Sequence, residues 1–509
     1  MNIRKLLTRL VSLALIVVFL PTVAMADTWY LEDGSITVSA TESGQNVSQG
    51  GVTKEDSAPV IRNRDSSAST TNNVTIRADT GATASVTLKD TNIDTTGGAG
   101  PKGAGDAAVR TEGGGNVNLN VELDNTLQSG NTHAGVEKGN GGNLTIGSES
   151  GSGQLVAVGA DGGAGIGSED RLASGNYNVG NITITGGDIF ATGNGGGAGI
   201  GGGWYCSASD ITITGGNVTA VGKEDNPNRI GGAGIGGGGS QSSNAGGGSN
   251  LKITGGRVTA VGGNFSAGIG GSIGSNGDNI TISDAEVIAI GGTCAAGIGG
   301  GCRLGNGIVG QGTNISISGS ANVKAAGGVG DSMDGAGAAI GAGGSHQGTT
   351  AQEGAADTSG LSPDGSVERL DPGTTFDIPQ PKPRSSFPKP APDPVAVEEE
   401  PQPVKAALYR VIDDAGKALP VETKQEDGVL LLTAQADIAI LEGAISGLQT
   451  LQSRGIDTIT FTNGTISVSF SLAEVIAKGA SSDVYRLTLS GGEASFTLGD
   501  ADITALLGK

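Results

Sequence analysis

One glycine-rich phrase repeats along this chain and limits how it can fold. Gly-Ala-Gly-Ile-Gly stands at residues 163–167, 197–201 and 232–236, and looser copies surround three further isoleucines. Successive isoleucines are 34, 35, 34, 29 and 42 residues apart, at Ile166, Ile200, Ile235, Ile269, Ile298 and Ile340. A near-constant period of this length predicts a solenoid, in which each repeat is one structural unit and the variation falls in loops.

Two further phrases lie between these copies. Ile-Thr-Ile-Thr-Gly-Gly stands at residues 182–187 and 211–216, and a third phrase at 217–222 is echoed at 257–262. Each holds four or five residues of alternating character before glycines permit a sharp turn, which is typical of short strands. Glycine also destabilises a helix by about 1 kcal/mol per residue relative to alanine. We therefore expect a mainly β fold, a right-handed parallel β-helix with three strands per coil.

One polar position recurs just before the second strand of each coil. It holds asparagine or aspartate in six successive copies: Asn143, Asn181, Asp210, Asn250, Asn279 and Asn314. Stacked coils would align these side chains in one ladder, and amides inside a corner of the helix can bond to one another. Asparagine is also a common turn residue, so the pattern fits an ordinary turn as well.

The chain divides into four segments by composition. Residues 1–26 combine basic residues, an apolar run and a small-x-small site, which predicts a secretory signal peptide cleaved near Ala26. Residues 27–345 contain the repeats and are expected to form the β-helix. Residues 346–404 turn polar and then rich in proline, which predicts a disordered linker. Residues 405–509 have ordinary globular composition and are expected to form a small α+β domain.

The C-terminal domain carries local signals of its own. Apolar residues that share one face predict a helix over residues 436–454. Asn463-Gly464, between two alternating segments, predicts a β-hairpin, and a second hairpin is expected around residues 491–492. Nothing in this domain suggests catalysis, because it has no histidine or cysteine and its acidic residues are scattered.

Charge and cysteine content restrict the partners. A formal net charge of -21 disfavours nucleic acid and anionic membranes, which would repel such a surface. After the leader, no segment approaches the ~20 apolar residues of a membrane span, so we expect a secreted or cell-surface protein. Cys206, Cys294 and Cys302 are too few for a disulfide framework. Eight residues of extended chain would hold Cys294 and Cys302 too far apart to bond unless both turns fold back. We therefore expect no essential disulfide, with a Cys294–Cys302 bridge as the exception.

The sequence predicts no catalytic, cofactor-binding or metal-binding residues. Residues 197–202 and 232–237 match the dinucleotide fingerprint G-x-G-x-x-G, but no helix follows to receive a pyrophosphate. A calcium-binding glycine repeat would need aspartate where this repeat has glycine. Polysaccharide lyases and hydrolases with this fold need carboxylates at matching positions of adjacent coils, whereas the aspartates here fall at different points. His133 and His346 lie at opposite ends of the solenoid, so we expect no enzymatic activity.

A ribbon of glycine backbone is one candidate binding surface. Alternation around Ile200 places Ala198 inward and both Gly199 and Gly201 outward, so that something can approach the backbone closely. Loops of the same chain, a second copy of the protein, or a sugar would each fit such a surface.

Aromatic and threonine side chains offer two further candidates. The rings that could stack on sugar faces are few, and they belong to Trp204, Tyr205, Phe265 and Tyr177. Trp204 and Tyr205 would equally well cap the apolar edge of a sheet. Threonine pairs at 183 and 185 and at 212 and 214 are of the type found in ice-binding solenoids, although threonine is also a common exposed strand residue.

Through these repeated phrases, the region from about residue 130 to residue 345 resembles the glycine-rich β-helix repeats of large exported surface proteins from Gram-positive bacteria. Such proteins are often described as carbohydrate-binding or adhesin-like, and the resemblance implies architecture without catalytic residues. The usual wall-attachment signals are not found, so the C-terminal domain is the expected anchor. Our hypothesis is an exported, non-enzymatic surface protein that binds glycans, cell-wall components or a second copy of itself. A polysaccharide-degrading enzyme is the alternative, and an ice-binding solenoid comes after it.

Overall fold

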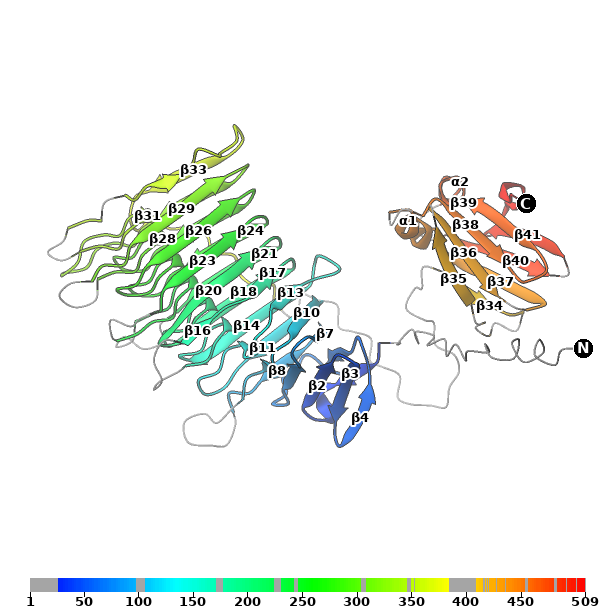
Figure 1. Cartoon of the computed structure of the whole chain (residues 1–509), viewed down its shortest axis with the longest axis horizontal. Helices are drawn as coiled ribbons and strands as arrows, with labels where there is room; N and C mark the ends of the chain where they lie inside the picture. The colour runs from blue at the N-terminus through cyan, green and yellow to red at the C-terminus, as the bar shows by residue number, and fades with distance from the viewer. Residues whose placement is uncertain are drawn as a thin grey trace, which may run out of the picture. The chain divides into compact units, whose positions relative to one another are not determined.

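The computed structural model contains two compact units, which divide after Asp393 (Figure 1). It describes residues 26–97, 106–170, 177–223, 230–241, 246–303, 308–345, 349–351, 353–383, 409–414, 417, 419, 421–426, 428–434, 436–453, 456–479, 483–490, 492–499 and 501–508. The predicted signal peptide lies outside these ranges, apart from Ala26. Among the described residues, no helix is long and apolar enough to cross a membrane.

The first unit is a parallel β-helix, as the repeats predict, and its strands stack from β2 to β33 in Figure 1. Most coils contribute one strand to each of three sheets. Sheet A holds β1 (Thr28–Tyr30), β5 (Val60–Arg62), β7 (Thr83–Lys89), β10 (Asn116–Glu122), β13 (Leu144–Gly147), β16 (Tyr177–Val179), β17 (Ile182–Ile184), β20 (Cys206–Ile213), β23 (Gly248–Ile253), β26 (Gly277–Ser283), β29 (Gly312–Ser318) and β32 (Ala356–Asp357).

The other two sheets complete each coil. Sheet B holds β2 (Ile36–Thr41), β3 (Gly44–Gln49), β4 (Val52–Glu55), β6 (Val74–Ala78), β9 (Val109–Glu112), β12 (Val136–Lys138), β15 (Ile166–Gly167), β19 (Ile200–Gly201), β22 (Ile235–Gly236), β25 (Ile269–Gly270), β28 (Ile298–Gly299) and β31 (Ile340–Gly341). Sheet C holds β8 (Asn92–Asp94), β11 (Asp124–Gln128), β14 (Gln154–Asp161), β18 (Asp188–Asn194), β21 (Asn217–Gly222), β24 (Arg257–Val261), β27 (Glu286–Ile290), β30 (Asn322–Ala326) and β33 (Ser366–Leu370).

Stacked aliphatic side chains form the core of the helix. The six repeat isoleucines pair in register from β15 to β31, and each is at most 1% exposed. Isoleucine and valine columns from sheets A and C face them, as in Ile184 and Ile189. Because each inward position repeats the same residue type, one coil's side chain rests on the next and no aromatic core is needed.

Both ends of the helix are closed by non-repeating structure. At the N-terminal end, β3 and β4 add antiparallel strands to sheet B, and the Trp29 indole donates to Asp56 at 2.9 Å. At the other end, the carboxylate of Glu353 accepts hydrogen bonds from the amides of Ala339, at 2.6 Å, and Ile340, at 3.1 Å. A side chain therefore replaces the missing next coil, and it prevents further strands from adding to this edge.

The β-helix continues beyond the predicted boundary at residue 345. β32 pairs with β29, β33 pairs with β30, and residues 371–383 remain with the first unit. The prediction of a disordered linker is thus wrong for residues 353–383, because the pairing of β32 and β33 and hydrogen bonds of Gly373 and Lys382 supply partners that the polar sequence does not reveal. Residues 384–408 lie outside the described ranges.

The second unit is a small α+β domain with two sheets. One holds β34 (Arg410–Ile412), β37 (Ile438–Ala444), β40 (Val484–Ser490), β41 (Glu493–Leu498) and β42 (Ala501–Asp502), and the other holds β35 (Val421–Glu426), β36 (Val429–Ala434), β38 (Thr458–Thr462) and β39 (Ser467–Ser471). Among the described residues, the remaining elements are helices α1 (Ile445–Ser453) and α2 (Leu472–Ile476) and the 3-10 turns η2 (Leu31–Asp33, in the first unit) and η4 (Thr504–Leu506).

Both predicted hairpins form, β38 with β39 and β40 with β41. The predicted helix over residues 436–454 is only half correct, because its first part is strand β37. That strand pairs with β34 on one side and β40 on the other, so tertiary pairing overrides the helical spacing.

Candidate functional site

Each Gly-Ala-Gly-Ile-Gly phrase reverses the chain instead of forming a longer strand. The amide of the alanine two residues before each isoleucine donates to the carbonyl two residues after it, at 2.8–3.1 Å, in the pairs Ala164–Ser168, Ala198–Gly202, Ala233–Gly237, Ala267–Gly271, Ala296–Gly300 and Ala338–Ala342. The isoleucine therefore lies at the inner tip, and the residues four before and four after it come side by side. We call the stack of these reversals, from four residues before to four after each isoleucine, the glycine lobe.

The chain reversal brings two of the three cysteines close enough to form a disulfide bond. Cys294 and Cys302 stand four residues before and four after Ile298, and they form a disulfide with a Cα–Cα distance of 5.2 Å. The argument that eight residues of extended chain would separate them fails, because the chain folds back at β28. Phe265 packs against the disulfide, and Cys206 is buried and lies outside this bond.

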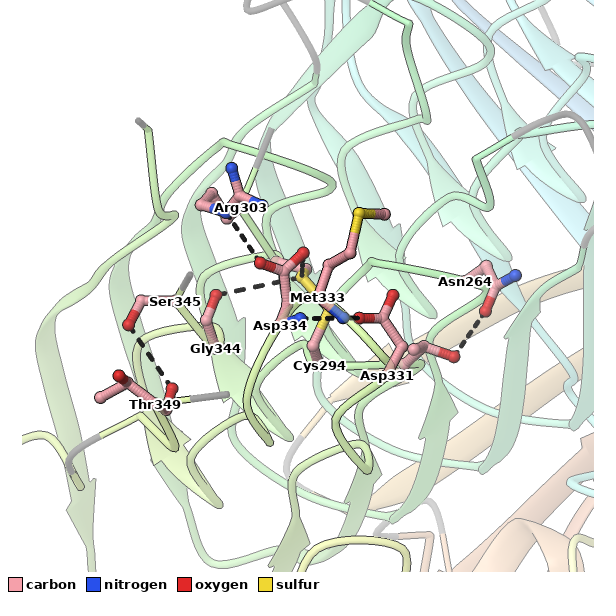
Figure 2. The surroundings of a disulfide bond; sticks show 11 residues. Asn264, Cys294, Arg303, Asp331, Met333, Asp334, Gly344, Ser345 and Thr349 are labelled. Atoms are coloured by element: carbon pink, nitrogen blue, oxygen red, sulfur yellow. Dashed lines mark hydrogen bonds and ion pairs between the residues drawn. A yellow bond between two sulfur atoms is a disulfide. The ribbon is translucent and has the colours of Figure 1, made fainter. Parts of the chain in front are cut away.

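A buried ion pair lies next to this disulfide. Arg303 Nε donates to Asp334 Oδ1 at 2.7 Å, and both side chains are almost fully buried (Figure 2). Cys294, Cys302 and Asp334 are close enough to suggest a metal site, but the disulfide leaves no thiolate to bind one. These contacts therefore join the last coils of the glycine lobe to one another.

The glycines of the lobe do not form an exposed ribbon. A Cβ on Gly199 would lie 2.4 Å from Val221 N and 2.6 Å from Gly234 O, which are backbone atoms of sheet C and of the next coil. Gly199 and Gly201 are buried. Of the occupants that the sequence leaves open, the chain's own backbone takes this surface, because the reversal folds it against sheet C.

The aromatic candidates are not assembled into a platform for sugar. Trp204 is 3% exposed, because its ring packs over Gly196, where a Cβ would lie 2.0 Å from the indole. Tyr205 stands edge-on to Trp204 with ring centroids 5.4 Å apart, and Phe265 lies two coils further along, half buried against the disulfide. The side chain of Tyr177 lies outside the described residues, although its backbone begins β16.

Four of the six predicted ladder residues bond to one another, but on the outside of the helix. Asn250 donates to Asp210 at 3.1 Å, Asn279 to Asn250 at 3.2 Å, and Asn314 to Asn279 at 3.0 Å. All four side chains are exposed, as is Asn181, so the expectation of a ladder inside a corner is wrong. Except for Asn143, the ladder residues have φ between 51° and 56°, a left-handed conformation that asparagine and aspartate tolerate best. These residues therefore form a left-handed turn in each coil and, from Asp210 to Asn314, a hydrogen-bonded ladder between coils.

A polar groove lies along the edge of sheet A where β16, β20, β23 and β26 stack. Its volume is about 460 Å³, and its polar lining comes from neighbouring coils: Asn178, Ser207, Ser249, Ser275, Asn276 and Asp278. Ile308, which is 54% exposed, adds one apolar wall. Asn178 donates to Ser209 at 2.7 Å, and Asp278 accepts a hydrogen bond from the Thr313 hydroxyl. We call this feature the sheet A groove.

Threonines of the outer face of sheet A also stack in register. Thr183 lies opposite Thr212, but Lys252 and then Thr281 follow in the same column. The lysine interrupts the regular threonine array that an ice-binding surface would need.

Sequence reasoning missed a cluster of charged side chains near the N-terminal coils. His133 Nδ1 lies 2.6 Å from Glu137 Oε2 and 3.3 Å from Glu169 Oε2, while Arg110 Nε lies 2.8 Å from Glu137 Oε1. These contacts with Glu137 and Glu169 raise the pKa of His133 to about 9. The signal that could have revealed the cluster is the register of Arg110 with Glu137, each one residue after an inward valine.

The cluster fits an ion-pair network better than a metal centre. At neutral pH the protonated His133 and Arg110 balance the charges of Glu137 and Glu169. Arg110 Nη2 also lies 3.2 Å from His133 Nδ1, the atom that would bind the metal. The Arg110 guanidinium would therefore repel a metal cation bound there. Beside the cluster, burial lowers the pKa of Lys138 to about 8.

Comparison with known proteins agrees with the fold. A family model described as a beta helix repeat matches residues 182–204, 211–239, 251–274 and 280–302. Each match starts at an inward residue of sheet A and passes through the isoleucine of sheet B, so one match corresponds to one coil. No curated protein and no solved structure matches the chain. Together with the parallel sheets, the match defines the class: the chain is a parallel β-helix protein.

Proposed function

We propose that this protein is an exported, non-enzymatic surface protein that binds carbohydrate along its β-helix, with the sheet A groove as the binding site. The observation that carries the proposal is the lining of this groove by amide, hydroxyl and carboxylate groups from four stacked strands. Such groups match the hydroxyl groups of a sugar chain, and their repetition along the helix axis suits an extended polymer.

The chemistry of the groove favours binding over hydrolysis. In the described part of its lining, Asp278 is the one carboxylate, whereas glycoside hydrolysis requires a pair. The leader-like N-terminus and the acidic surface support export, and the resemblance to exported surface proteins supports a role at the cell surface.

A glycan array probed with the full-length protein tests the proposal. Ser249→Phe would fill the groove with an aromatic ring, and Thr281→Phe places the same ring on the outer face of sheet A, away from the groove lining. We expect at least a tenfold loss of binding for the first variant and little change for the second. Equal binding by both variants and the wild type would place the ligand elsewhere, and no bound glycan at all would refute the carbohydrate proposal.

A polysaccharide-degrading enzyme is the second candidate, and one observation favours it. Glu137 and Glu169, from neighbouring coils, bring two carboxylates to the same imidazole. Glu137 is already engaged by Arg110 and is 6% exposed, which leaves little access for a substrate. Release of reducing ends or unsaturated products from a polysaccharide by the wild type, but not by Glu137→Gln, would support this alternative.

The second unit is proposed to retain the protein at the cell surface. Producing cells can be fractionated after expression of the full chain and of a chain that ends before residue 405. Equal retention of both forms would exclude this role.

A further inference from the structure

The outer face of sheet C is more apolar than that of sheet A. In sheet A, one outward column reads Thr145, Thr183, Thr212, Lys252 and Thr281. In sheet C, the corresponding central column reads Val156, Phe190, Thr219, Thr259 and Ile288. A second outward column of sheet C reads Val158, Thr192, Val221, Val261 and Ile290. An apolar face of this length marks an interaction surface.

This face is only partly open to solvent. Thr219 is 6% exposed and Thr259 is 2% exposed, although the alternation of the strands directs both side chains outward. After β33 the chain turns at Asp371, whose carbonyl accepts from the amide of Thr374 at 3.1 Å, and it then runs back along the helix. We call residues 373–383 the strap.

Two anchors fix the path of the strap across sheet C. Near the end of the helix, the Gly373 amide donates to Gly327 O, just after β30, at 2.9 Å. Five strands away, the Lys382 amide donates to Gln154 Oε1, in β14, at 2.9 Å. Gln154 is in register with the first residue of β30, so the two anchors lie at opposite corners of sheet C. The usual spacings along and between strands place them about 29 Å apart. The nine residue steps from Gly373 to Lys382 reach ~28 Å in an extended, proline-type conformation.

The second anchor is built to hold a peptide backbone. Gln154 is 1% exposed, and its side chain both accepts from the Lys382 amide and donates to the Lys382 carbonyl, at 3.2 Å. The side-chain amide of Gln154 also donates to Asp124 Oδ1 at 3.0 Å, and this bond fixes the orientation of the Gln154 side chain. Lys382 Nζ lies 3.2 Å from Asp188 Oδ2, so a cation at this position is recognised as well.

The centre of the strap is held differently. Thr374, Phe376 and Ile378 are half buried, whereas the residues between them, Thr375 and Asp377, are exposed. In the described residues, no hydrogen bond joins residues 375–381 to the β-helix. Prolines within the strap lack the N–H that a strand ladder would need. The strap is therefore bound by alternate side chains and its two ends, and by far fewer bonds than a strand of the helix.

We propose that the outer face of sheet C is a binding surface for an extended, proline-containing peptide, and that the strap occupies it as a displaceable latch. The peptide that fits carries apolar side chains at alternate positions, followed by prolines and a lysine for Asp188. The surface is distinct from the sheet A groove, and the inference does not depend on carbohydrate binding.

Peptide binding to the full-length protein tests this inference. The probe is a fluorescent synthetic peptide with the sequence of residues 371–383, and its binding is measured by anisotropy. In the wild type, the tethered strap competes at an effective concentration in the millimolar range. Phe376→Ser with Ile378→Ser weakens the strap and leaves sheet C intact, so it should bind the peptide at least tenfold more tightly than the wild type. Adding Gln154→Ala should reverse that gain.

Two results would overturn the proposal. One is equal peptide affinity for the wild type and the strap variant, with both folded by circular dichroism. The other comes from hydrogen exchange in the wild type, which needs no variant. The amides of Gly373 and Lys382, which donate to the β-helix, should exchange at least about 100-fold faster than those of β33, and equal protection would show that the strap does not detach.

Discussion

Replacing Gly199 by alanine tests the central feature of this fold, the packing of the glycine lobe against sheet C. A Cβ at this position would lie 2.4 Å from Val221 N, 2.6 Å from Gly234 O and 2.7 Å from Ala220 C. All three are backbone atoms, so no side-chain rotation can relieve the overlap and one coil must shift away from sheet C. Overpacking of a close-packed interior typically costs about 1–3 kcal/mol, and we expect Gly199→Ala to reach about 3 kcal/mol.

Gly186→Ala is the matched control in the same coil. Gly186 also has a negative φ, and its added Cβ would meet nothing closer than Ser148 N at 3.7 Å. This variant should stay within about 0.5 kcal/mol of the wild type. Urea unfolding followed by circular dichroism gives both free energies, and hydrogen exchange at Val221 should report local opening in Gly199→Ala. Equal stability of the two variants would refute the view that backbone contact, and not turn geometry, requires glycine here.

Three further predictions concern the disulfide, the histidine cluster and the end of the β-helix. Replacing Cys294 and Cys302 by serine should lower the free energy of unfolding by about 2.5 kcal/mol, because the bond closes a loop of eight residues, and thermal unfolding of the reduced wild type should agree. The pKa of His133 is about 9 in the folded chain, against 6.5 for an unperturbed histidine, so its ion pairs stabilise fully below about pH 6.5 and are lost as the pH rises through 9. Imidazole resonances should titrate near pH 9, and stability should not fall in this window in His133→Gln. Glu353→Ala should free two edge amides and increase self-association in light scattering, whereas Glu368→Ala, at an exposed ion pair, should not.

The C-terminal unit shows which elements a local sequence pattern can predict and which it cannot. Asn463-Gly464 identified a hairpin because the turn depends on the two residues themselves, and Gly464 indeed has a φ of 86°. The spacing of Ile438 and Leu441 suggested a helix, yet both lie in β37. A run of consecutive apolar residues fits a buried strand as well as a helix, and only its pairing with β34 and β40 decides.

The candidate site was less accessible from the sequence than the fold. The sequence context of Trp204 predicts an exposed loop and a ring that could stack on a sugar, but the glycine lobe buries the ring. The sheet A groove joins residues as far apart as Asn178 and Asp278. Hydroxyl and amide residues of this kind occur throughout the chain, so no pattern distinguished those that meet in one groove.

The sequence by itself determined the coil: its length, its three strands, its isoleucine core and the turns at the recurring asparagines. Each of these depends on contacts that repeat with the period of the chain, so the repeat encodes them locally. Only the tertiary structure decided that Cys294 meets Cys302, that Glu137 and Glu169 converge on His133, and that the strap returns to Gln154. Each of these contacts occurs once and joins segments that fold back on each other or lie in different coils. No periodic pattern in the sequence therefore predicts them.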